Sequence, residues 1–199
     1  MTKTLVIILL TSMLPVAAFG QMDKDEIKKT FENYFRTVQQ KDNAQTLEYI
    51  YPKLFEHFPK DRMLEAMDRM KADTTTIIAL GNPSVTGISE PLELDGIKYA
   101  RIRYSFKMTM TIVTTGEETE STEDEDFNPA DFTYEMLKEI HGDKNVVYDR
   151  ENSKIDINVT NEMYAINDPT YTGWKFLEKK DSMKPVLEKL LPKKVLKKL

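Results

Sequence analysis

A carboxylate and two phenols on strand-like segments are the residues of this sequence from which acid–base chemistry could be built. Glu162 could accept a proton, and Tyr104 or Tyr164 could donate one. No motif joins them into a catalytic set, and such chemistry would need an unpaired acid beside a phenol within a pocket. Acid–base catalysis is therefore the alternative hypothesis, and the sequence assigns no catalytic residue.

Most other catalytic chemistries lack their residues. His57 and His141 are the two histidines, and no H-E-x-x-H pair places them on one helical face. The absence of cysteine removes thiolate metal ligands and thiol nucleophiles. The segment GNPSVTG does not match the G-x-S-x-G nucleophile elbow, and neither a Walker loop nor a G-x-G-x-x-G turn occurs. The sequence thus predicts no metal site and no cofactor, and it favours a non-enzymatic protein.

The most acidic part of the chain is GEETESTEDED, residues 116–126, which holds seven carboxylates. Its spacing does not match the D-x-[DN]-x-[DN]-G pattern of a calcium-binding loop. The pattern favours a solvated connection between two structured segments. Adventitious binding of divalent cations and a dedicated cation site at 117–126 remain as alternatives.

Residues 1–20, MTKTLVIILLTSMLPVAAFG, have the order typical of a secretory signal peptide. Lys3 precedes an apolar run, and small residues follow at Ala18 and Gly20. The run is shorter than the ~20 apolar residues that span a bilayer, although a single-pass anchor remains the alternative. No cysteine is available for lipid attachment. We therefore expect a periplasmic or secreted protein whose mature chain begins near Gln21.

Composition indicates one exported domain that does not bind nucleic acid. The whole chain has 28 basic and 33 acidic residues, and residues 1–20 contain one of the basic residues and none of the acidic ones. The mature chain would therefore have 27 basic and 33 acidic residues and a net charge of −6. The fold must be held by its core, and a domain of ~150 residues buries roughly 68–70% of its unfolded surface. We predict a signal peptide (1–20), a single α+β domain (21–180) and a lysine-rich helical tail (181–199).

Helical spacing dominates the first part of the predicted domain. A helix is expected over residues 25–40, where apolar side chains recur every three or four positions. A short second helix should begin at Asp42 or Asn43 and end before Pro52, and Pro59 should open a third. The stripe of the first helix comprises Ile27, Phe31, Tyr34, Phe35 and Val38.

After Asp73 the pattern becomes the alternation typical of strands. TTTIIAL and SVTGISE read as extended segments, and Asp95 with Gly96 forms a two-residue hairpin turn. Between Ala100 and Ile112, apolar residues alternate with charged or polar ones, so one face of a curved antiparallel sheet should be buried. Arg101 and Arg103 lie on the opposite face, where solvent, an anionic partner or a homodimer contact would meet them.

The second half contains one inserted helix between strands. Asn128 should cap a helix near residues 129–141, whose apolar stripe is expected to include Phe132, Met136, Leu137 and Ile140. A second hairpin should turn at residues 151–153, and GWKFLE should form the last strand. Pro192 divides the tail into two helical pieces. Packing of the tail against the sheet is favoured over contact with an anionic membrane, because the tail lacks tryptophan and phenylalanine.

The order of these elements, with IKKTFENYFRTVQQKD in the first helix, YPKLFEHFP after it and GWKFLE in the last strand, resembles the nuclear transport factor 2-like superfamily. Within it, the chain is similar to small exported bacterial proteins. The resemblance implies helices wrapped by a bent sheet in a cone with a pocket, and it includes isomerase and cyclase branches. The isomerase residues have no counterparts here, and both the inserted helix and the tail depart from the pattern.

If the inner face of the strand from Ala100 to Ile112 closes over the first helix, a set of aromatic and methionine side chains should meet near its middle. These residues are ordinary core material, and they could also line a ligand pocket. We expect the protein to bind a small apolar ligand or a protein partner there; its oligomeric state stays open. The candidate pocket residues are Tyr34, Tyr104, Phe106, Met108 and Trp174.

Overall fold

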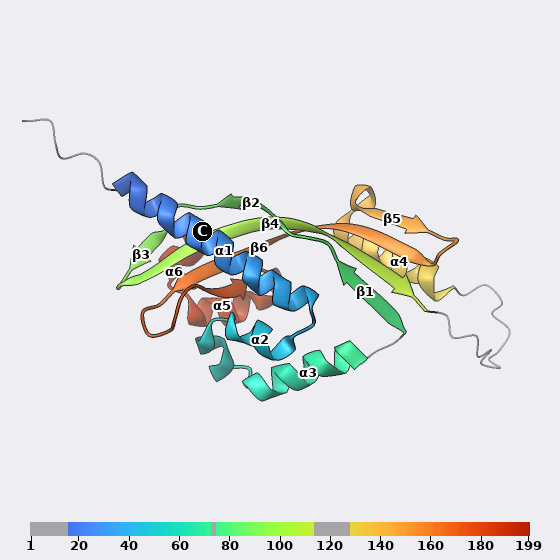
Figure 1. The fold of residues 1–199 in the computed structure, drawn as a ribbon, viewed down its shortest axis with the longest axis horizontal. Helices are drawn as coiled ribbons and strands as arrows, with labels where there is room; N and C mark the ends of the chain where they lie inside the picture. The colour runs from blue at the N-terminus through green and yellow to red at the C-terminus, as the bar shows by residue number, and fades with distance from the viewer. Residues whose placement is uncertain (1–15, 73–74, 114–127) are drawn as a thin grey trace, which may run out of the picture.

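The computed structural model describes residues 16–72, 75–113 and 128–199, which form an α+β structure with one open antiparallel sheet (Figure 1). Positions 1–15 of the predicted signal peptide and the acidic stretch at 117–126 lie outside the described residues. The six helices of the described part are α1 (Val16–Gln39), α2 (Asn43–Glu48), α3 (Lys60–Ala72), α4 (Pro129–His141), α5 (Lys184–Leu190) and α6 (Lys193–Lys198).

Seven strands make up the sheet. They are β1 (Thr76–Leu80), β2 (Ser84–Ile88), β3 (Leu92–Leu94), β4 (Ile97–Ile112), β5 (Val146–Asp149), β6 (Lys154–Asn167) and β7 (Lys175–Glu178). The predicted hairpin turn between β3 and β4 is confirmed, with φ of +53° at Asp95 and +76° at Gly96. The predicted N-cap of α4 is also confirmed, since the side chain of Asn128 accepts hydrogen bonds from two backbone N–H groups of the first turn.

The long pair β4–β6 is the backbone of the sheet. Its ladder runs without interruption from Lys98 opposite Asn167 to Thr111 opposite Lys154. On its other side β4 pairs in turn with β3, β2 and β1, and β6 pairs with β7 and β5. The two central strands therefore have partners along most of their length, and the shorter strands form the edges.

Alternation along β4 and β6 divides the core between the two faces of the sheet. Ala100, Ile102 and Tyr104 of β4 lie with Met163 and Ala165 of β6 against α1. Tyr99, Tyr164 and Ile166 point to the other face, where they meet the C-terminal helices. The tail thus packs against the sheet, as predicted: its buried residues are Leu187, Leu191, Val195 and Leu199.

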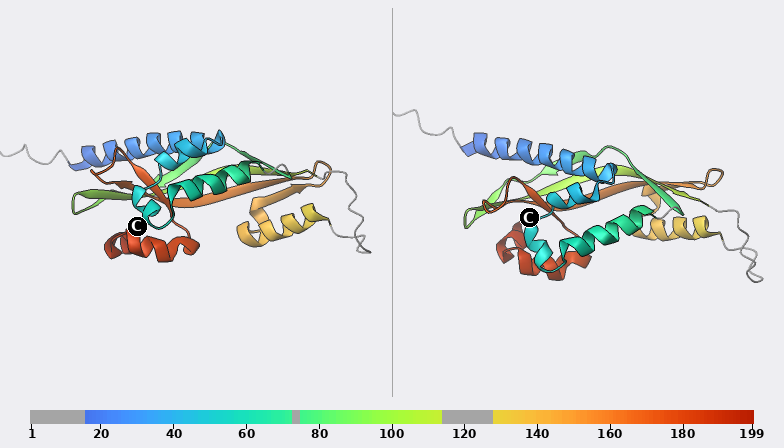
Figure 2. Two further views of the ribbon diagram at one scale, coloured as in Figure 1. Left: turned by 90° about the horizontal axis from the view of Figure 1, so that it is seen from below. Right: turned by 60° about the horizontal axis from the view of Figure 1, so that its bottom comes forward.

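Helix α4 packs on the same face of the ribbon as α1, farther along it. The odd-numbered residues Ile155, Ile157 and Val159 of β6 lie in one cluster with Leu137 of α4, and the even-numbered end of β4 packs against them. A long antiparallel strand pair twists along its length, so the same face of the β4–β6 pair points in different directions at its two ends. As a result α1 and α4 lie on different sides of the molecule and at different ends of it (Figure 2).

This arrangement corrects the prediction that the whole inner face of β4 closes over the first helix. Only the stretch up to Phe106 packs against α1, and the stretch from Met108 onward packs near α4. The stripe expected to be buried on α4 is also largely wrong. Leu137 is buried, but Met136 and Ile140 are exposed by 43% and 64%.

Helix α3 is amphipathic in sequence, yet none of its residues is buried. Its contacts are mostly to α2 rather than to the sheet, and it lies at the lower edge of the molecule in Figure 1. Within the described ranges, no helix combines the length and apolarity needed to cross a membrane.

The packing of the tail predicts a stability effect. Leu191→Ala should lower the free energy of unfolding by about 2–5 kcal/mol, because the side chain is 4% exposed and its removal leaves a cavity. Urea unfolding followed by circular dichroism measures this. The matched control is Lys197→Ala on the exposed side of α6, which should have little effect. Equal stability of both variants would show that the tail is not part of the folded core.

Candidate functional site

A cleft lies over the middle of the β4–β6 ribbon, between the C-terminal part of α1 and the C-terminal end of α4. Its volume is about 590 Å³, within the range of ordinary ligand pockets. Tyr104, Phe106 and Met108 of β4 form much of its floor, Tyr34 comes from α1, and Ile140 comes from α4. We call this the central cleft. It exists because α1 and α4 cover the two ends of one sheet face and leave its middle open.

Four of the five predicted pocket residues line the central cleft: Tyr34, Tyr104, Phe106 and Met108. Trp174 is the exception. It is 1% exposed in the core beneath α1, where its indole N–H donates to Glu26 Oε2 at 3.3 Å. Trp174 directly precedes β7, and its ring packs in the core cluster that α1 covers rather than in the lining of the cleft.

Burial makes the two phenols of the central cleft weak acids. The pKa of Tyr34 is raised far above its usual value by burial, then by the neighbouring charges of Tyr104 and Glu178. Burial also raises the pKa of Tyr104 to about 12, although the side chain of Asn161 acts in the opposite direction. Both phenols therefore remain protonated at physiological pH, as hydrogen-bond donors.

The polar residues at the edge of the central cleft include an ion pair that the sequence analysis missed. Lys180 Nζ lies 2.7 Å from Glu178 Oε2, and both side chains are partly exposed. His141 and Asn161 contribute further polar groups. Alternation offers a signal for Glu178, because it follows Trp174 and Phe176 at intervals of two on the last strand and so shares their face.

The alternative acid–base set is divided between the two faces of the sheet. Tyr104 faces α1, whereas Glu162 and Tyr164 lie in a separate hollow of about 380 Å³ beside α5 and α6. Lys179 and Tyr164 are close in this hollow, with the ammonium 5.8 Å from the centre of the ring. The structure therefore does not bring Glu162 and Tyr104 together.

Glu162 is not an unpaired acid. It accepts hydrogen bonds from Arg103 at 2.8 and 3.0 Å and from Lys179 at 3.0 Å, and Arg101 lies 3.8 Å away. Burial acts to raise its pKa, but these hydrogen bonds and charges together hold the pKa below its usual value. A carboxylate stabilised in this way is a weak proton acceptor. Both arginines lie on the face opposite α1, as expected, and the side chain of Arg103 remains 56% exposed to solvent while it pairs with Glu162.

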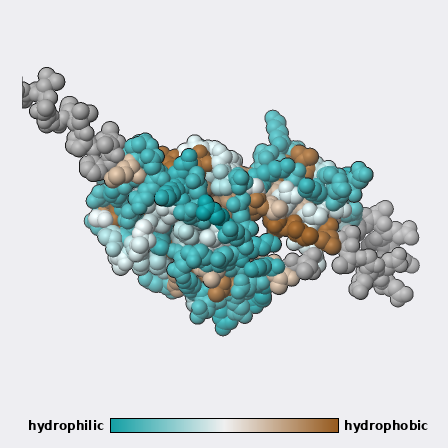
Figure 3. All heavy atoms as spheres, viewed as in Figure 1, coloured by the Kyte–Doolittle hydropathy of each residue, from teal (hydrophilic) through white to brown (hydrophobic). Residues whose placement is uncertain are grey.

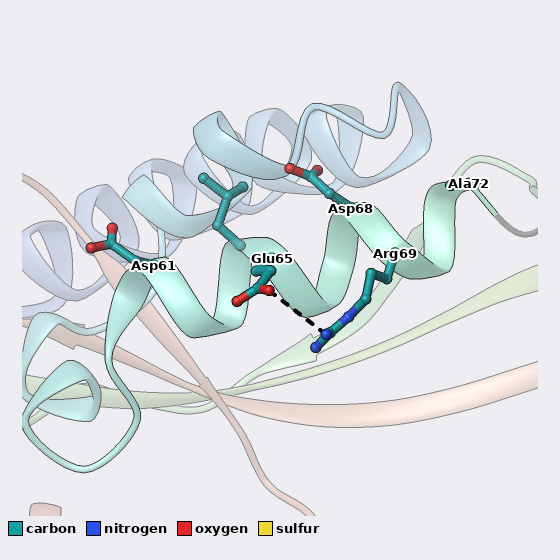
Figure 4. Close-up of a pocket in the computed structure, with 6 residues that line it drawn as sticks. Asp61, Glu65, Asp68, Arg69 and Ala72 are labelled. Atoms are coloured by element: carbon teal, nitrogen blue, oxygen red, sulfur yellow. Dashed lines mark ion pairs between the residues drawn. The ribbon is translucent and has the colours of Figure 1, made fainter.

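A third hollow, on α3, is a poor candidate. Its lining residues Asp61, Glu65, Asp68 and Arg69 all come from this single helix, and Glu65 pairs with Arg69 at 3.7 Å (Figure 4). In the part of the chain that the structure describes, no other element contributes to the lining of this hollow. Among the described residues, no group of three or more His, Cys, Asp or Glu side chains could hold a metal ion.

Comparisons of the chain with protein-family models, with curated proteins and with solved structures each found no match. The central cleft and its chemistry are accordingly the basis for a functional assignment.

The raised pKa of Tyr104 predicts how stability changes in alkali. The folded protein holds this proton more tightly than the unfolded chain, whose tyrosines titrate near 10.0, so the stabilisation is complete below pH 10 and is lost as the pH rises toward 12. Its size is about 2–3 kcal/mol, from a shift of about two units. Tyr104→Phe should therefore lose less stability than the wild type between pH 10 and 12.

Urea unfolding at several pH values measures this difference. Tyr148→Phe, on β5 and outside the central cleft, is the matched control and should follow the wild type. Parallel pH profiles for the wild type and Tyr104→Phe would contradict the environment described for the phenol.

Proposed function

We propose that this chain is an exported, non-catalytic binding protein that holds a small apolar ligand in the central cleft. The observation that carries the proposal is the cleft itself: an aromatic and aliphatic floor of suitable volume, with polar groups at its edge, positioned by the strands of the sheet. A filled core would leave no such volume beside Tyr34 and Tyr104.

Binding is favoured over acid–base catalysis by the state of the carboxylates. Glu162 is surrounded by three cations, and Glu178 of the central cleft is paired with Lys180. A general base needs a carboxylate that can take a proton from a bound substrate, but the partners of Glu162 hold its pKa below the usual value, and Glu178 already forms an ion pair with Lys180. The phenols offer hydrogen bonds but no proton transfer at neutral pH.

We also propose that the chain is a member of the nuclear transport factor 2-like superfamily, and the arrangement of the fold supports this proposal. A long helix lies against a twisted antiparallel sheet, in the chain order that the resemblance implies. The cone of that superfamily is the finer part of the proposal, since the sheet here is open and α4 occupies its far end.

The other proposed roles have less support. Burial of four tail residues against the sheet removes the apolar stripe that a membrane contact would need. The second candidate ligand is a protein that would contact the exposed apolar side chains near α4. This partner could be another protein or a second copy of the chain.

A blocked-cleft variant tests the binding role. N-phenyl-1-naphthylamine, a neutral fluorescent probe, should bind the wild type and should bind Val38→Trp at least about tenfold more weakly, because the indole would fill the central cleft from α1. Fluorescence titration measures the affinity. Val147→Trp adds the same ring to an exposed position on β5 and should bind like the wild type. Equal binding by Val38→Trp would refute the proposal.

The proposed export is tested separately by measuring the mass of the recovered protein. When the full chain is expressed in a bacterium with a cell envelope, the protein recovered from the periplasm or medium should lack residues 1–20. Intact-mass spectrometry detects this. Ile8→Arg in the apolar run should abolish export, whereas Thr2→Ala should not. Recovery of uncleaved protein from the cytoplasm alone would contradict the signal peptide.

A further inference from the structure

The hydroxyl of Tyr34 points to the kind of ligand that the central cleft accepts. Tyr34 is 9% exposed and lines the cleft, and its ring packs between Phe31, Tyr49 and Phe176. Within the described part of the chain, its hydroxyl forms no hydrogen bond with another protein group. The hydroxyl is also absent from the fully buried polar atoms that lack a partner in the described residues, so it is accessible from the cleft. A phenol in such a position can donate a hydrogen bond to an acceptor oxygen on a ligand.

The charges around the central cleft favour an uncharged ligand head. Glu178 and Lys180 neutralise each other at 2.7 Å, and both line the edge of the cleft. A carboxylate or an ammonium entering the cleft would find Glu178 and Lys180 already paired with each other. Either ion would lose its hydration without gaining a free counter-charge, which is costly. A hydroxyl or carbonyl group avoids this cost.

An apolar path leads from the floor of the central cleft onto α4. Ile140 lines the cleft and is 64% exposed, and Met136 lies one turn earlier and is 43% exposed. The two positions are about 6 Å apart along the helix. Hydrophobic surface gathers over the region where α4 and β1 lie (Figure 3). A chain that leaves the cleft would therefore continue over apolar side chains.

A peptide fits the central cleft less well than a small amphiphile. The backbone beneath the cleft is already paired on both sides: Tyr104 with Asn161 and Val85, and Met108 with Ile157 and Leu80. No free strand edge is thus available at these positions to satisfy the N–H and C=O groups of an entering peptide. A single polar head followed by a hydrocarbon chain needs only one hydrogen bond.

We propose that the ligand is a single-chain amphiphile with an uncharged oxygen-bearing head, such as a long-chain alcohol or ketone. The head accepts a hydrogen bond from Tyr34, and the chain passes over the floor of the central cleft to Ile140 and Met136. This inference rests on the proposed function and adds the chemical class of the ligand.

Displacement of N-phenyl-1-naphthylamine from the purified full chain tests the head. At concentrations below micelle formation, 1-dodecanol and 2-dodecanone should displace the probe, and dodecanoate and dodecylammonium should do so at least about tenfold more weakly. Tyr34→Phe should weaken binding of 2-dodecanone by about 2- to 13-fold, the equivalent of one neutral hydrogen bond, when the displacement is corrected for the variant's own measured affinity for the probe. Equal displacement by either ion, or an unchanged affinity of Tyr34→Phe for 2-dodecanone, would overturn the assignment of the head.

Ligands with hydrocarbon chains of different length test the proposed path along α4. Met136→Ser should weaken binding of 1-dodecanol several-fold and should leave 1-hexanol unaffected, because only the longer chain reaches this residue. Glu139→Ser, also exposed on α4, is the matched control. An equal effect of both substitutions would overturn the path. If the probe itself does not bind the wild type, the proposed function fails first, and this result is distinct from failure of the ligand class.

Discussion

The uninterrupted ladder between β4 and β6 is the constraint on which the rest of the structure depends. Because its residues pair in one register from end to end, every side chain of both strands is committed to one face or the other. A slip of one residue would exchange Ile102 and Met163 for charged neighbours such as Arg101 and Glu162. The core beneath α1, the core beneath the C-terminal helices and the cluster at α4 all follow from this one pairing.

The central cleft is a consequence of twist rather than of a dedicated loop. A flat ribbon would let α1 and α4 lie side by side on one face, and their side chains would close over the floor. Because the ribbon turns along its length, α1 and α4 lie on different sides of the molecule (Figure 2), and the residues between them line the central cleft. Rigid strands then hold Tyr104, Phe106 and Met108 in place, which gives a preformed floor and reduces the entropy cost of binding.

The distribution of charge separates the two faces chemically. On the face covered by the C-terminal helices, three cations surround Glu162, and this network ties β4 and β6 to the segment that leads into the tail. On the face of the central cleft, buried phenols and one mutually neutral ion pair are the main polar features. Carboxylates that are paired and phenols that stay protonated are suited to holding a ligand by packing and hydrogen bonding.

The sequence by itself determined the elements of this protein. Periodicity, the Asp95–Gly96 turn, the Asn128 cap and Pro192 were sufficient to place helices, hairpins and the divided tail, because these signals are local. It also identified four residues of the central cleft, since alternation assigns Tyr104, Phe106 and Met108 to the inner face and the helical stripe includes Tyr34. Only the tertiary structure decided that α4 exposes Met136 and Ile140 and that Trp174 is core rather than part of the cleft. Those outcomes depend on how far the ribbon twists between distant segments, and no local pattern carries that information.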